Sequence, residues 1–304
     1  MTSSRELFIV VNPAAGGGSA ARAQSAVAEY LCARGCRAQI CESKGAEDIR
    51  EQAARATAAG YQHIVALGGD GTFHHLAEAI RGTNAIAGLL PAGNGNDAAR
   101  ALGIPRDPIR AADAFLRAQR RTIDLIRARF AGGRVEHCVC TAGAGLDAEA
   151  AHLANTRFRN WPGVTRYLMG AAAAFSKRAA FDLHADLDGK AWQGPALFAV
   201  AANAPEYGGG IRIARDAKLD DGWLDVAIVR DLSWTRFLEA IPTLLTSGDL
   251  RMQELERFRA RCIRIEAPSG VRVHGDGEIL GETPVEFEIV PAALHVMAPK
   301  SLND

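Results

Sequence analysis

The sequence lacks an excess of charge of either sign. Lys and Arg together number 35, as do Asp and Glu, so the formal net charge is zero. A protein that holds nucleic acid mainly through its phosphates should be basic. We therefore expect no nucleic-acid partner, and any anionic ligand must be held by local geometry.

Long apolar runs are also missing. No stretch approaches the ~18 apolar residues of a membrane span, and the nearest, Leu168–Phe175, is short and mostly alanine. The first residues lead directly into the strand-like LFIVV, without the apolar segment and cleavage site of a signal peptide. We expect a cytoplasmic protein that meets a membrane only at its surface.

The six cysteines form no CxxC pair. Cys138 and Cys140 lie two residues apart in an apolar stretch that indicates a strand, so both are expected on one face. Because no paired spacing occurs, we expect all six cysteines, Cys32, Cys36, Cys41, Cys138, Cys140 and Cys262, to be buried, reduced thiols rather than zinc ligands or disulfides.

A length of 304 residues with 48% hydrophobic content favours two globular domains. The first part alternates apolar strands with amphipathic helices, which predicts a parallel sheet covered on both faces. The expected strands are Leu7–Val11, Arg37–Cys41, His63–Leu67 and Ala85–Leu90, and the expected helices are Ala20–Leu31, Glu47–Ala59, Phe73–Ile80 and Ile109–Leu116.

The pattern changes after Asp124. Phe181–Asp188 alternates apolar and polar residues up to a hairpin signal at Asp188-Gly189, and further strand-like segments follow. Helical patterns interrupt them near Thr165–Phe175 and Trp234–Leu245. We predict a mostly antiparallel β-sandwich over 131–291, after an α/β domain over 1–130 that the C-terminal segment 292–304 joins.

Glycine-rich loops follow the first, third and fourth expected strands, at 12–18, 68–72 and 91–97. Open α/β sheets bind ligands at the carboxyl ends of their strands, where glycine lets backbone N–H groups approach a phosphate. Neither GxGxxG nor GxxxxGK[ST] occurs with the expected flanks. The loops therefore predict a phosphate site of another kind.

These motifs resemble the diacylglycerol kinase catalytic-domain family, in particular its soluble bacterial lipid kinases. The resemblance rests on VNP at 11–13, GGDGT at 68–72 and PAGNGND at 91–97, and continues with GAGLD at 143–147, KLDDGWLD at 218–225 and DGE at 276–278. Sphingosine and ceramide kinases are similar, and NAD kinases and phosphofructokinases are more distant. The resemblance implies a Rossmann-like α/β nucleotide-binding domain and a C-terminal β-sandwich with the lipid site.

The resemblance also assigns residues to ATP and to the chemistry. Asp70 is expected beside the phosphates, and Glu278 is expected to be the general base that accepts the proton of the lipid hydroxyl. The residues expected to contact ATP are Asn12, Pro13, Ser43, Gly68, Gly69, Asp70, Gly71, Thr72, Gly93, Asn94, Gly95 and Asn96.

Two magnesium sites are implied in the same way. Asp97 and Asp124 are expected to form, with Asp70, an acidic and water-linked Mg²⁺ network. Lys218, Asp221 and Trp223 match the spacing of a structural Mg²⁺ site made of one carboxylate and two backbone carbonyls. Oxygen ligands suit Mg²⁺, and phosphoryl transfer needs mainly positioning and charge neutralisation. Taken alone, each of these acids also fits a structural role in a turn or cap.

Some positions depart from the family pattern. Asn94 stands where threonine or serine is common, His74 and His75 where Asn-Glu is frequent, and Ala98 where phenylalanine is usual. These changes bear on nucleotide preference and rate more than on the type of reaction.

The sequence therefore predicts an ATP- and Mg²⁺-dependent kinase acting on the hydroxyl of diacylglycerol or a similar lipid. An NAD kinase-like enzyme acting on a ribose hydroxyl and a non-catalytic lipid- or nucleotide-binding relative are the alternatives. A homodimer is left open.

Transient contact with a membrane surface is also expected. The proposed membrane patch combines Arg157, Arg159, Arg166, Lys177 and Arg178 with Phe158, Trp161, Tyr167 and Phe175. The alternative is that these basic residues form a solvated helical face.

Overall fold

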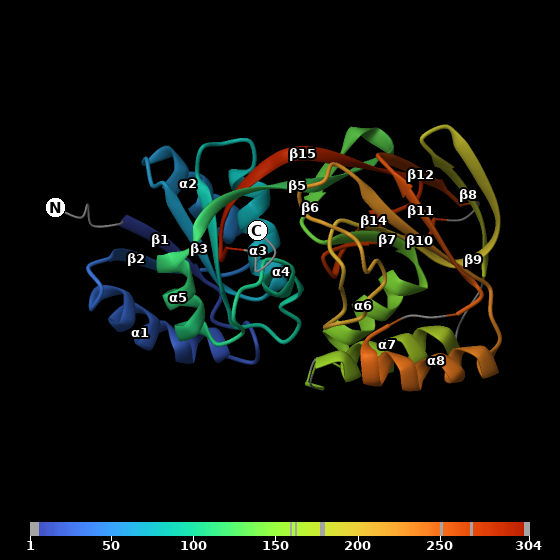
Figure 1. The fold of residues 1–304 in the computed structure, drawn as a ribbon, viewed down its shortest axis with the longest axis horizontal. Helices are drawn as coiled ribbons and strands as arrows, with labels where there is room; N and C mark the ends of the chain where they lie inside the picture. Colours follow the sequence, from blue (N-terminus) through green and yellow to red (C-terminus); the bar gives the residue numbers. More distant parts are fainter. Residues whose placement is uncertain are drawn as a thin grey trace. The chain divides into compact units, whose positions relative to one another are not determined.

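The computed structural model describes residues 6–300, except 159, 162, 177–179, 250–251 and 268–269. The chain splits into two compact units, Met1–Ile123 with Ala292–Asp304, and Asp124–Pro291. Strands β5 (Gln119–Phe130) and β15 (Val285–Ala298) carry the chain from one unit to the other (Figure 1). A boundary between folding domains at residue 130 stays a prediction.

The first unit contains a parallel sheet in the order β15-β4-β3-β1-β2. Its strands are β1 (Glu6–Val11), β2 (Arg37–Glu42), β3 (His63–Gly68) and β4 (Ile86–Pro91), and the end of β15 pairs with β4. Nearly all residues of β1, β3 and β4 are buried, as in a sheet covered on both faces. The expected α/β architecture is confirmed.

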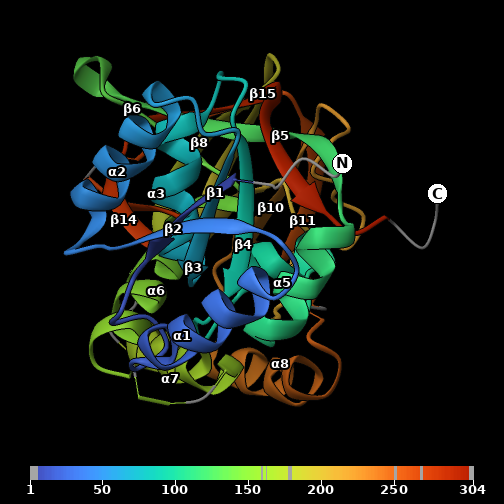
Figure 2. The same ribbon diagram turned by 90° about the vertical axis from the view of Figure 1, so that its left-hand side faces the viewer.

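In the described part of this unit, the sheet is accompanied by the helices α1 (Ser19–Cys32), α2 (Ala46–Ala58), α3 (Asp70–Ile80), α4 (Asp97–Ala101) and α5 (Pro108–Arg117). Helix α1 packs beside α5, and α2 packs beside α3 on the opposite face (Figure 2). The sequence pattern suggested that the third helix starts at Phe73, but it starts at Asp70, within the GGDGT motif. This earlier start places the Asp70 carboxylate in the first helical turn.

The second unit is built from antiparallel strands in the order β14-β13-β7-β9-β8-β12-β15, with β10 pairing with β9 and β11. They form a β-sandwich-like domain, as expected. Besides β5 and β15, they are β6 (Val135–Cys138), β7 (Thr141–Gly145), β8 (Phe181–Leu187), β9 (Lys190–Ala202), β10 (Leu224–Arg230), β11 (Leu255–Ala260), β12 (Cys262–Glu266), β13 (Arg272–Gly275) and β14 (Glu278–Glu282).

The core of this unit follows the two-residue period of its strands. Leu183, Ala185 and Leu187 of β8 point inward and meet Ile263 and Ile265 of β12 in one apolar cluster. Within its described residues, the unit also contains the α-helices α6 (Leu146–Thr156), α7 (Gly163–Ser176) and α8 (Trp234–Ser247). Over the described residues, no helix has the length and apolar character that crossing a membrane requires.

Two expectations about the cysteines were wrong. Strand β6 ends at Cys138, so Cys140 does not share a strand with it. The backbone N–H groups of Val139 and Cys140 donate to the Asp276 carboxylate instead of to a neighbouring strand. Cys32 is exposed, although Cys36, Cys138 and Cys140 are buried as expected.

Candidate active site

The glycine loops of the first unit contact one another through their backbones at the edge where the strands end. The Ala92 N–H donates to the Gly68 carbonyl at 2.7 Å. A Cβ atom on Gly93 would lie 2.5 Å from the Gly69 Cα, and one on Gly16, whose φ is +58°, would lie 2.0 Å from the Ala92 oxygen. Only glycine fits at these contacts, so the loops form one continuous backbone surface.

Asn12 links the end of β1 to the start of α3. Its side-chain nitrogen donates to the Thr72 hydroxyl at 3.2 Å, and its backbone N–H donates to the Leu67 carbonyl at 3.1 Å. Pro13 follows in the same loop and is partly buried. Asn12 and Thr72, both predicted to contact ATP, therefore lie together.

Ser43 follows β2 at the same edge, where its N–H donates to the Val11 carbonyl at 2.7 Å. The residue is 6% exposed, and its hydroxyl oxygen has no hydrogen-bond partner among the described residues. Buried hydroxyl groups are usually hydrogen-bonded, so this oxygen is a candidate ligand contact.

Asp70 and Asp97 occupy the starts of adjacent helices. The Asp70 carboxylate accepts the Ala98 N–H at 3.0 Å, which ties α3 to α4, and the Asp97 carboxylate accepts the Arg100 guanidinium. Carboxylate oxygens are among the ligands that Mg²⁺ prefers. The part of Asp70 and Asp97 in a metal network stays a prediction.

The loop before α4 is shaped by Asn96. Its side-chain oxygen accepts the Gly93 N–H at 3.1 Å, and its side-chain nitrogen donates to the Gly93 carbonyl at 2.8 Å. Asn94, between the glycines, is exposed, whereas Gly95 is buried. Asn96 thus holds the loop in shape, while Asn94 presents its amide to solvent.

Helices α1, α2 and α3 begin after Gly18, Gly45 and Gly69, and none of these N-termini has a side-chain cap. By contrast, Asp107 caps α5 by accepting the Arg110 N–H at 2.8 Å. The first N–H groups of a helix lack partners within it, and together with the helix dipole they bind anions. Helices α1 and α3 therefore present anion-binding ends at the glycine loops, and α2 presents one after β2, where Ser43 bonds the Val11 carbonyl.

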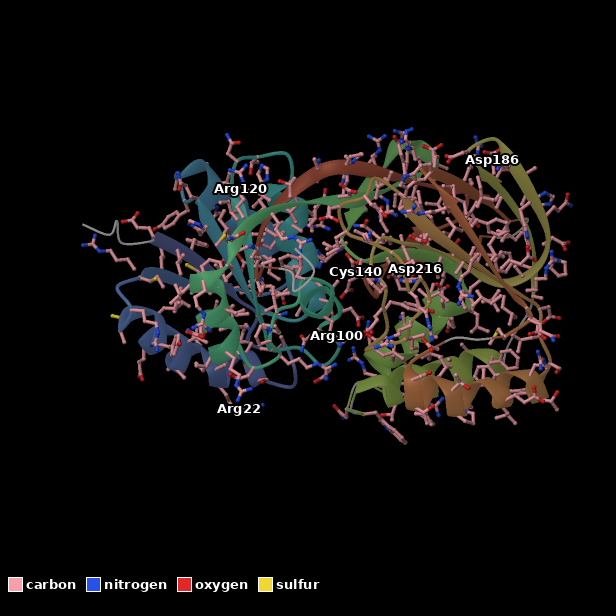
Figure 3. The ribbon with its side chains drawn as sticks, viewed as in Figure 1. Arg22, Arg100, Arg120, Cys140, Asp186 and Asp216 are labelled. Carbon is pink, nitrogen blue, oxygen red and sulfur yellow. The ribbon has the colours of Figure 1, made fainter. Side chains whose placement is uncertain are left out.

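Two arginines beside these loops were not found from the sequence (Figure 3). Arg22 of α1 donates to the Gly17 carbonyl at 3.2 Å, and Arg100 of α4 donates to the Gly95 carbonyl at 2.6 Å. Each stands about one helical turn after a glycine loop, the spacing that returns a side chain to the helix start. That spacing could have identified them.

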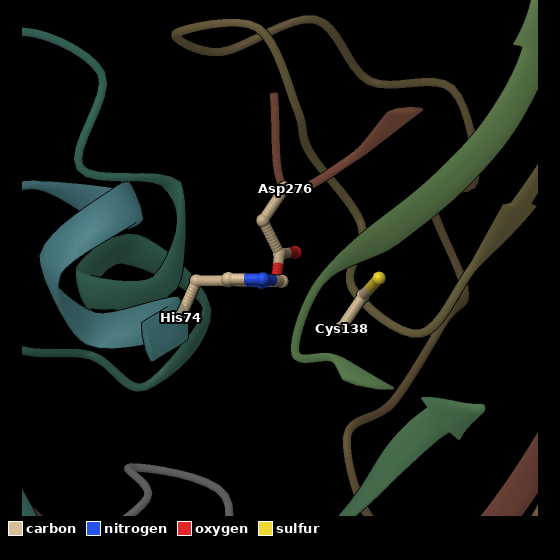
Figure 4. A group of neighbouring side chains, drawn as sticks. All are labelled: His74, Cys138 and Asp276. Carbon is tan, nitrogen blue, oxygen red and sulfur yellow. The ribbon is translucent and has the colours of Figure 1, made fainter. Parts of the chain in front are cut away.

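In the second unit, the DGE motif forms the turn between β13 and β14. The Asp276 carboxylate accepts the N–H groups of Val139 and Cys140, both at 2.7 Å, and of Thr141 at 3.2 Å. Figure 4 shows this carboxylate beside Cys138 of β6; His74, also labelled there, belongs to α3 of the first unit. Asp276 therefore anchors the turn from which the exposed Glu278 projects.

A buried pair lies behind this turn. The Asp147 carboxylate, at the end of the GAGLD motif, is 2.8 Å from the His274 Nε2, and the two side chains are 2% and 1% exposed. A Cβ atom on Gly143 would lie 2.4 Å from the same carboxylate oxygen. The Tyr207 ring stacks on His274, and burial, with the Asp147 charge, raises the pKa of Tyr207. The GAGLD motif thus braces β13.

Asp124 fixes the loop of the KLDDGWLD motif. It is 4% exposed, its carboxylate accepts the Gly222 N–H at 2.7 Å, and its own N–H donates to the Leu219 carbonyl at 2.6 Å. Asp124 is therefore joined to the loop that carries Lys218, Asp221 and Trp223.

The predicted residues thus gather in three groups: the glycine loops with Asp70 and Asp97, the Asp124 loop, and the turn of Glu278. Asp70 and Glu278 belong to different units, and their meeting at one reaction centre stays a prediction.

His74 is buried and His75 partly buried, and their rings pack edge to face at 5.0 Å.

Two family models match the chain. The model described as diacylglycerol kinase catalytic domain matches residues 6–128, and the YegS C-terminal NAD kinase beta sandwich-like domain matches residues 140–298. They cover the parallel sheet and the antiparallel strands respectively.

Curated relatives match over most of their length. The diacylglycerol kinase of Mycobacterium tuberculosis is 32% identical over 96% of this chain and 94% of its own. A Pseudomonas putida protein named "Probable lipid kinase YegS-like" is 35% identical over 84% of this chain and 83% of its own. A crystal structure described as "a putative diacylglycerol kinase" from Bacillus anthracis superposes with a TM-score of 0.81 over 98% of both chains at 22% identity, so it shares the fold. The chain belongs to the diacylglycerol kinase catalytic-domain family.

Proposed function

We propose that this chain, a lipid kinase by its family, transfers the γ-phosphoryl group of ATP to the hydroxyl of diacylglycerol or of a similar lipid. The product from diacylglycerol would be phosphatidic acid. The observation that carries the proposal is the contact of the glycine loops beside three uncapped helix starts. That surface offers backbone N–H groups to a polyphosphate.

On the donor side, the glycine loops bind the phosphates, and Asn12, Thr72 and Ser43 contact the nucleotide. Arg22 and Arg100 add positive charge beside the loops. Asp70, with Asp97 and Asp124, would hold Mg²⁺. The bound ion supplies charge neutralisation at the phosphates.

On the acceptor side, the Glu278 carboxylate takes the proton of the lipid hydroxyl. The hydroxyl oxygen forms a bond to the γ-phosphorus as the bond to the bridging oxygen of ADP breaks, and ADP leaves. Glu278 follows the Asp276 turn, whose three backbone hydrogen bonds limit its movement. The rigid turn supports the general-base role, because proton transfer requires a fixed donor–acceptor distance.

The direct test is incubation of the enzyme with ATP, Mg²⁺ and a total lipid extract, followed by mass spectrometry of the products. A parallel assay uses radiolabelled ATP with a lipid panel and with NAD, each with and without Mg²⁺. Label in a lipid phosphate that requires Mg²⁺ supports the proposal. Label in NADP alone would replace it with the soluble-substrate reaction, and no label in any acceptor would reject it.

The proposal includes contact with a membrane surface, because the substrate is a lipid. Helices α7 and α8 lie side by side, with Phe175 against Trp234 and Phe237 (Figures 1 and 2). The large exposed apolar side chains of this region are Trp161, Met169, Trp234, Leu238 and Leu245. Amphipathic aromatic and aliphatic side chains of this kind insert at a bilayer interface.

The patch expected from the sequence needs revision. Phe158 and Phe175 are buried and pack inside the unit, so they are unsuited to membrane contact. Arg159, Lys177 and Arg178 lie outside the described residues. Arg157 is exposed, and the partly buried Arg166 bonds the Tyr167 hydroxyl at 2.7 Å. The revised surface is mainly apolar and centred on α8.

A homodimer is a further part of the proposal. Among the described strands of the first unit, β2 pairs with β1 along one edge, and its other edge could accept a strand from a second copy. Light scattering at the protein concentration of the kinase assay measures the mass directly.

A further inference from the structure

The register between β10 and β11 places an arginine opposite the last acid of the KLDDGWLD motif. Asp225 pairs with Arg259 in the antiparallel ladder, and the Arg259 Nε lies 3.9 Å from the Asp225 carboxylate. Cross-strand partners stand close enough for their side chains to interact. The position of Arg259 is therefore set by the sheet itself.

From there the guanidinium reaches the turn that precedes β10. An Arg259 Nη2 donates to the Asp221 Oδ2, and the guanidinium lies 5.5 Å from the centre of the Trp223 ring. Arg261, two residues along, lies 4.8 Å from the same ring. Arg259 thus contacts three side chains of one motif.

Asp221 is the single carboxylate expected at the structural Mg²⁺ site, and both of its oxygens have partners. Oδ2 accepts from Arg259, and Oδ1 accepts the Trp223 N–H at 3.1 Å. Mg²⁺ requires near-octahedral coordination by oxygen and exchanges its bound water for protein ligands unfavourably. At Asp221 it would also be repelled by the positive charge of the Arg259 guanidinium. The arrangement does not fit a magnesium ion.

We propose that the guanidinium of Arg259 is the cation of this turn and that the turn needs no divalent metal. A planar guanidinium with several N–H donors joins Asp221 to the β-ladder at Asp225, as a metal would join a carboxylate to its surroundings. The inference concerns a structural site in the second unit. It stands apart from the proposed reaction and from the magnesium expected at Asp70.

The test is thermal unfolding of the full chain, without nucleotide, in EDTA and in millimolar MgCl₂. Any rise of the wild-type midpoint with Mg²⁺ is expected to persist in Asp221→Asn, because an ion held at Asp70, Asp97 and Asp124 does not use the Asp221 carboxylate. Arg259→Gln is expected to lower it by about 2–4 °C, and Arg259→Lys by less, because the lysine keeps the charge. Arg264→Gln is the matched control, since Arg264 pairs with Glu266 at 2.8 Å on β12 and does not contact the turn.

Two results would overturn the proposal. One is a saturable rise of the wild-type midpoint with Mg²⁺ that Asp221→Asn abolishes. The other is an Arg259→Gln midpoint no lower than that of Arg264→Gln. If Arg259→Gln does not fold, the comparison is made with Arg259→Lys, whose midpoint in EDTA must lie below the wild-type value and above that of Asp221→Ala.

Discussion

The Asp276 carboxylate accepts the Cys140 N–H at 2.7 Å, across 136 residues of sequence. Val139 and Thr141 donate to the same carboxylate, which holds the turn that precedes Glu278. Asp276→Asn replaces one carboxylate oxygen with an NH₂ group, which cannot accept a hydrogen bond from these backbone N–H groups. We expect a loss of about 2 kcal/mol in the free energy of unfolding, measured with urea, because charge-assisted bonds of this kind are stronger than neutral ones.

A second Asp-Gly turn provides the control. Asp188 has the same φ of 51° as Asp276, and its carboxylate accepts the N–H groups of Arg261 and Cys262 at 2.8 and 2.9 Å. Asp188→Asn should lower stability but leave kcat unchanged, whereas Asp276→Asn should lower both. Equal kcat in the two variants would mean that the Asp276 turn has no part in positioning Glu278.

Glu278→Gln tests the general base. Loss of a positioned base lowers kcat by about 10²–10⁴-fold, and the fold should be retained because Glu278 is exposed. Asp70→Asn should be similarly inactive, and His75→Ala milder. Initial rates with saturating ATP and lipid give the values, and the exposed Glu282 of the same strand, changed to Gln, is the control. Turnover by Glu278→Gln near that of Glu282→Gln would remove the assignment.

The donor half of the site was accessible from the sequence because it is local. Each glycine loop directly follows a strand, and parallel strands bring their carboxyl ends to one edge. Asn12 and Thr72 meet for this reason, although 60 residues separate them. The helix start at Asp70 was missed because Gly69 and Gly71, on either side of it, favour a loop over a helix.

The second unit was harder to predict because its contacts depend on register. Arg259 meets Asp225 only through the pairing of β10 with β11, and α8 lies between the two strands in the sequence. The position of an antiparallel strand along its neighbour is not visible in either segment alone. The same holds for Asp276, whose partners Val139, Cys140 and Thr141 lie just before and at the start of β7.

Gly93→Ala tests the contact between the loops. A Cβ atom there would lie 2.5 Å from the Gly69 Cα, so backbone must move, whereas one on Gly69 would lie 3.1 Å from the Gly93 Cα. We expect Gly93→Ala to raise the KM for ATP at least about tenfold and to lower stability by about 1–3 kcal/mol. Gly69→Ala, measured in the same assays, should be milder. An unchanged KM in Gly93→Ala would show that the contact does not shape the nucleotide site.

The apolar surface on α8 can be tested on phospholipid vesicles. Leu238 is 56% exposed, and removing a buried side chain of this size from a bilayer costs about 1.5–3 kcal/mol. Leu238→Ser should therefore weaken vesicle binding by about tenfold or more in a sedimentation assay, with activity on a short-chain, water-soluble diacylglycerol unchanged. The control is Val135→Ser, at an exposed position of β6. Equal vesicle binding by the two variants would show that Leu238 and the surface around it do not contact the membrane.

The C-terminal part of β15 should make the stability of the first unit depend on pH. The His295 Nε2 lies 2.7 Å from an Arg120 nitrogen, and its Nδ1 lies 3.0 Å from the Thr122 hydroxyl. Arginine can only donate, so Nε2 accepts, and the ring is neutral with its proton on Nδ1. Burial, with the nearby Arg120 charge, lowers the pKa of His295 from its ordinary value of 6.5.

Because the unfolded chain then binds the proton more tightly, the neutral ring stabilises the fold above pH 6.5. This contribution is lost as the pH falls from that value through the lowered pKa. In urea unfolding at a series of pH values, the stability advantage of the wild type over His295→Gln should shrink on acidification through this window. An advantage that stays constant with pH would mean that the ring is protonated with equal ease in the folded and unfolded chains, contrary to its contact with Arg120.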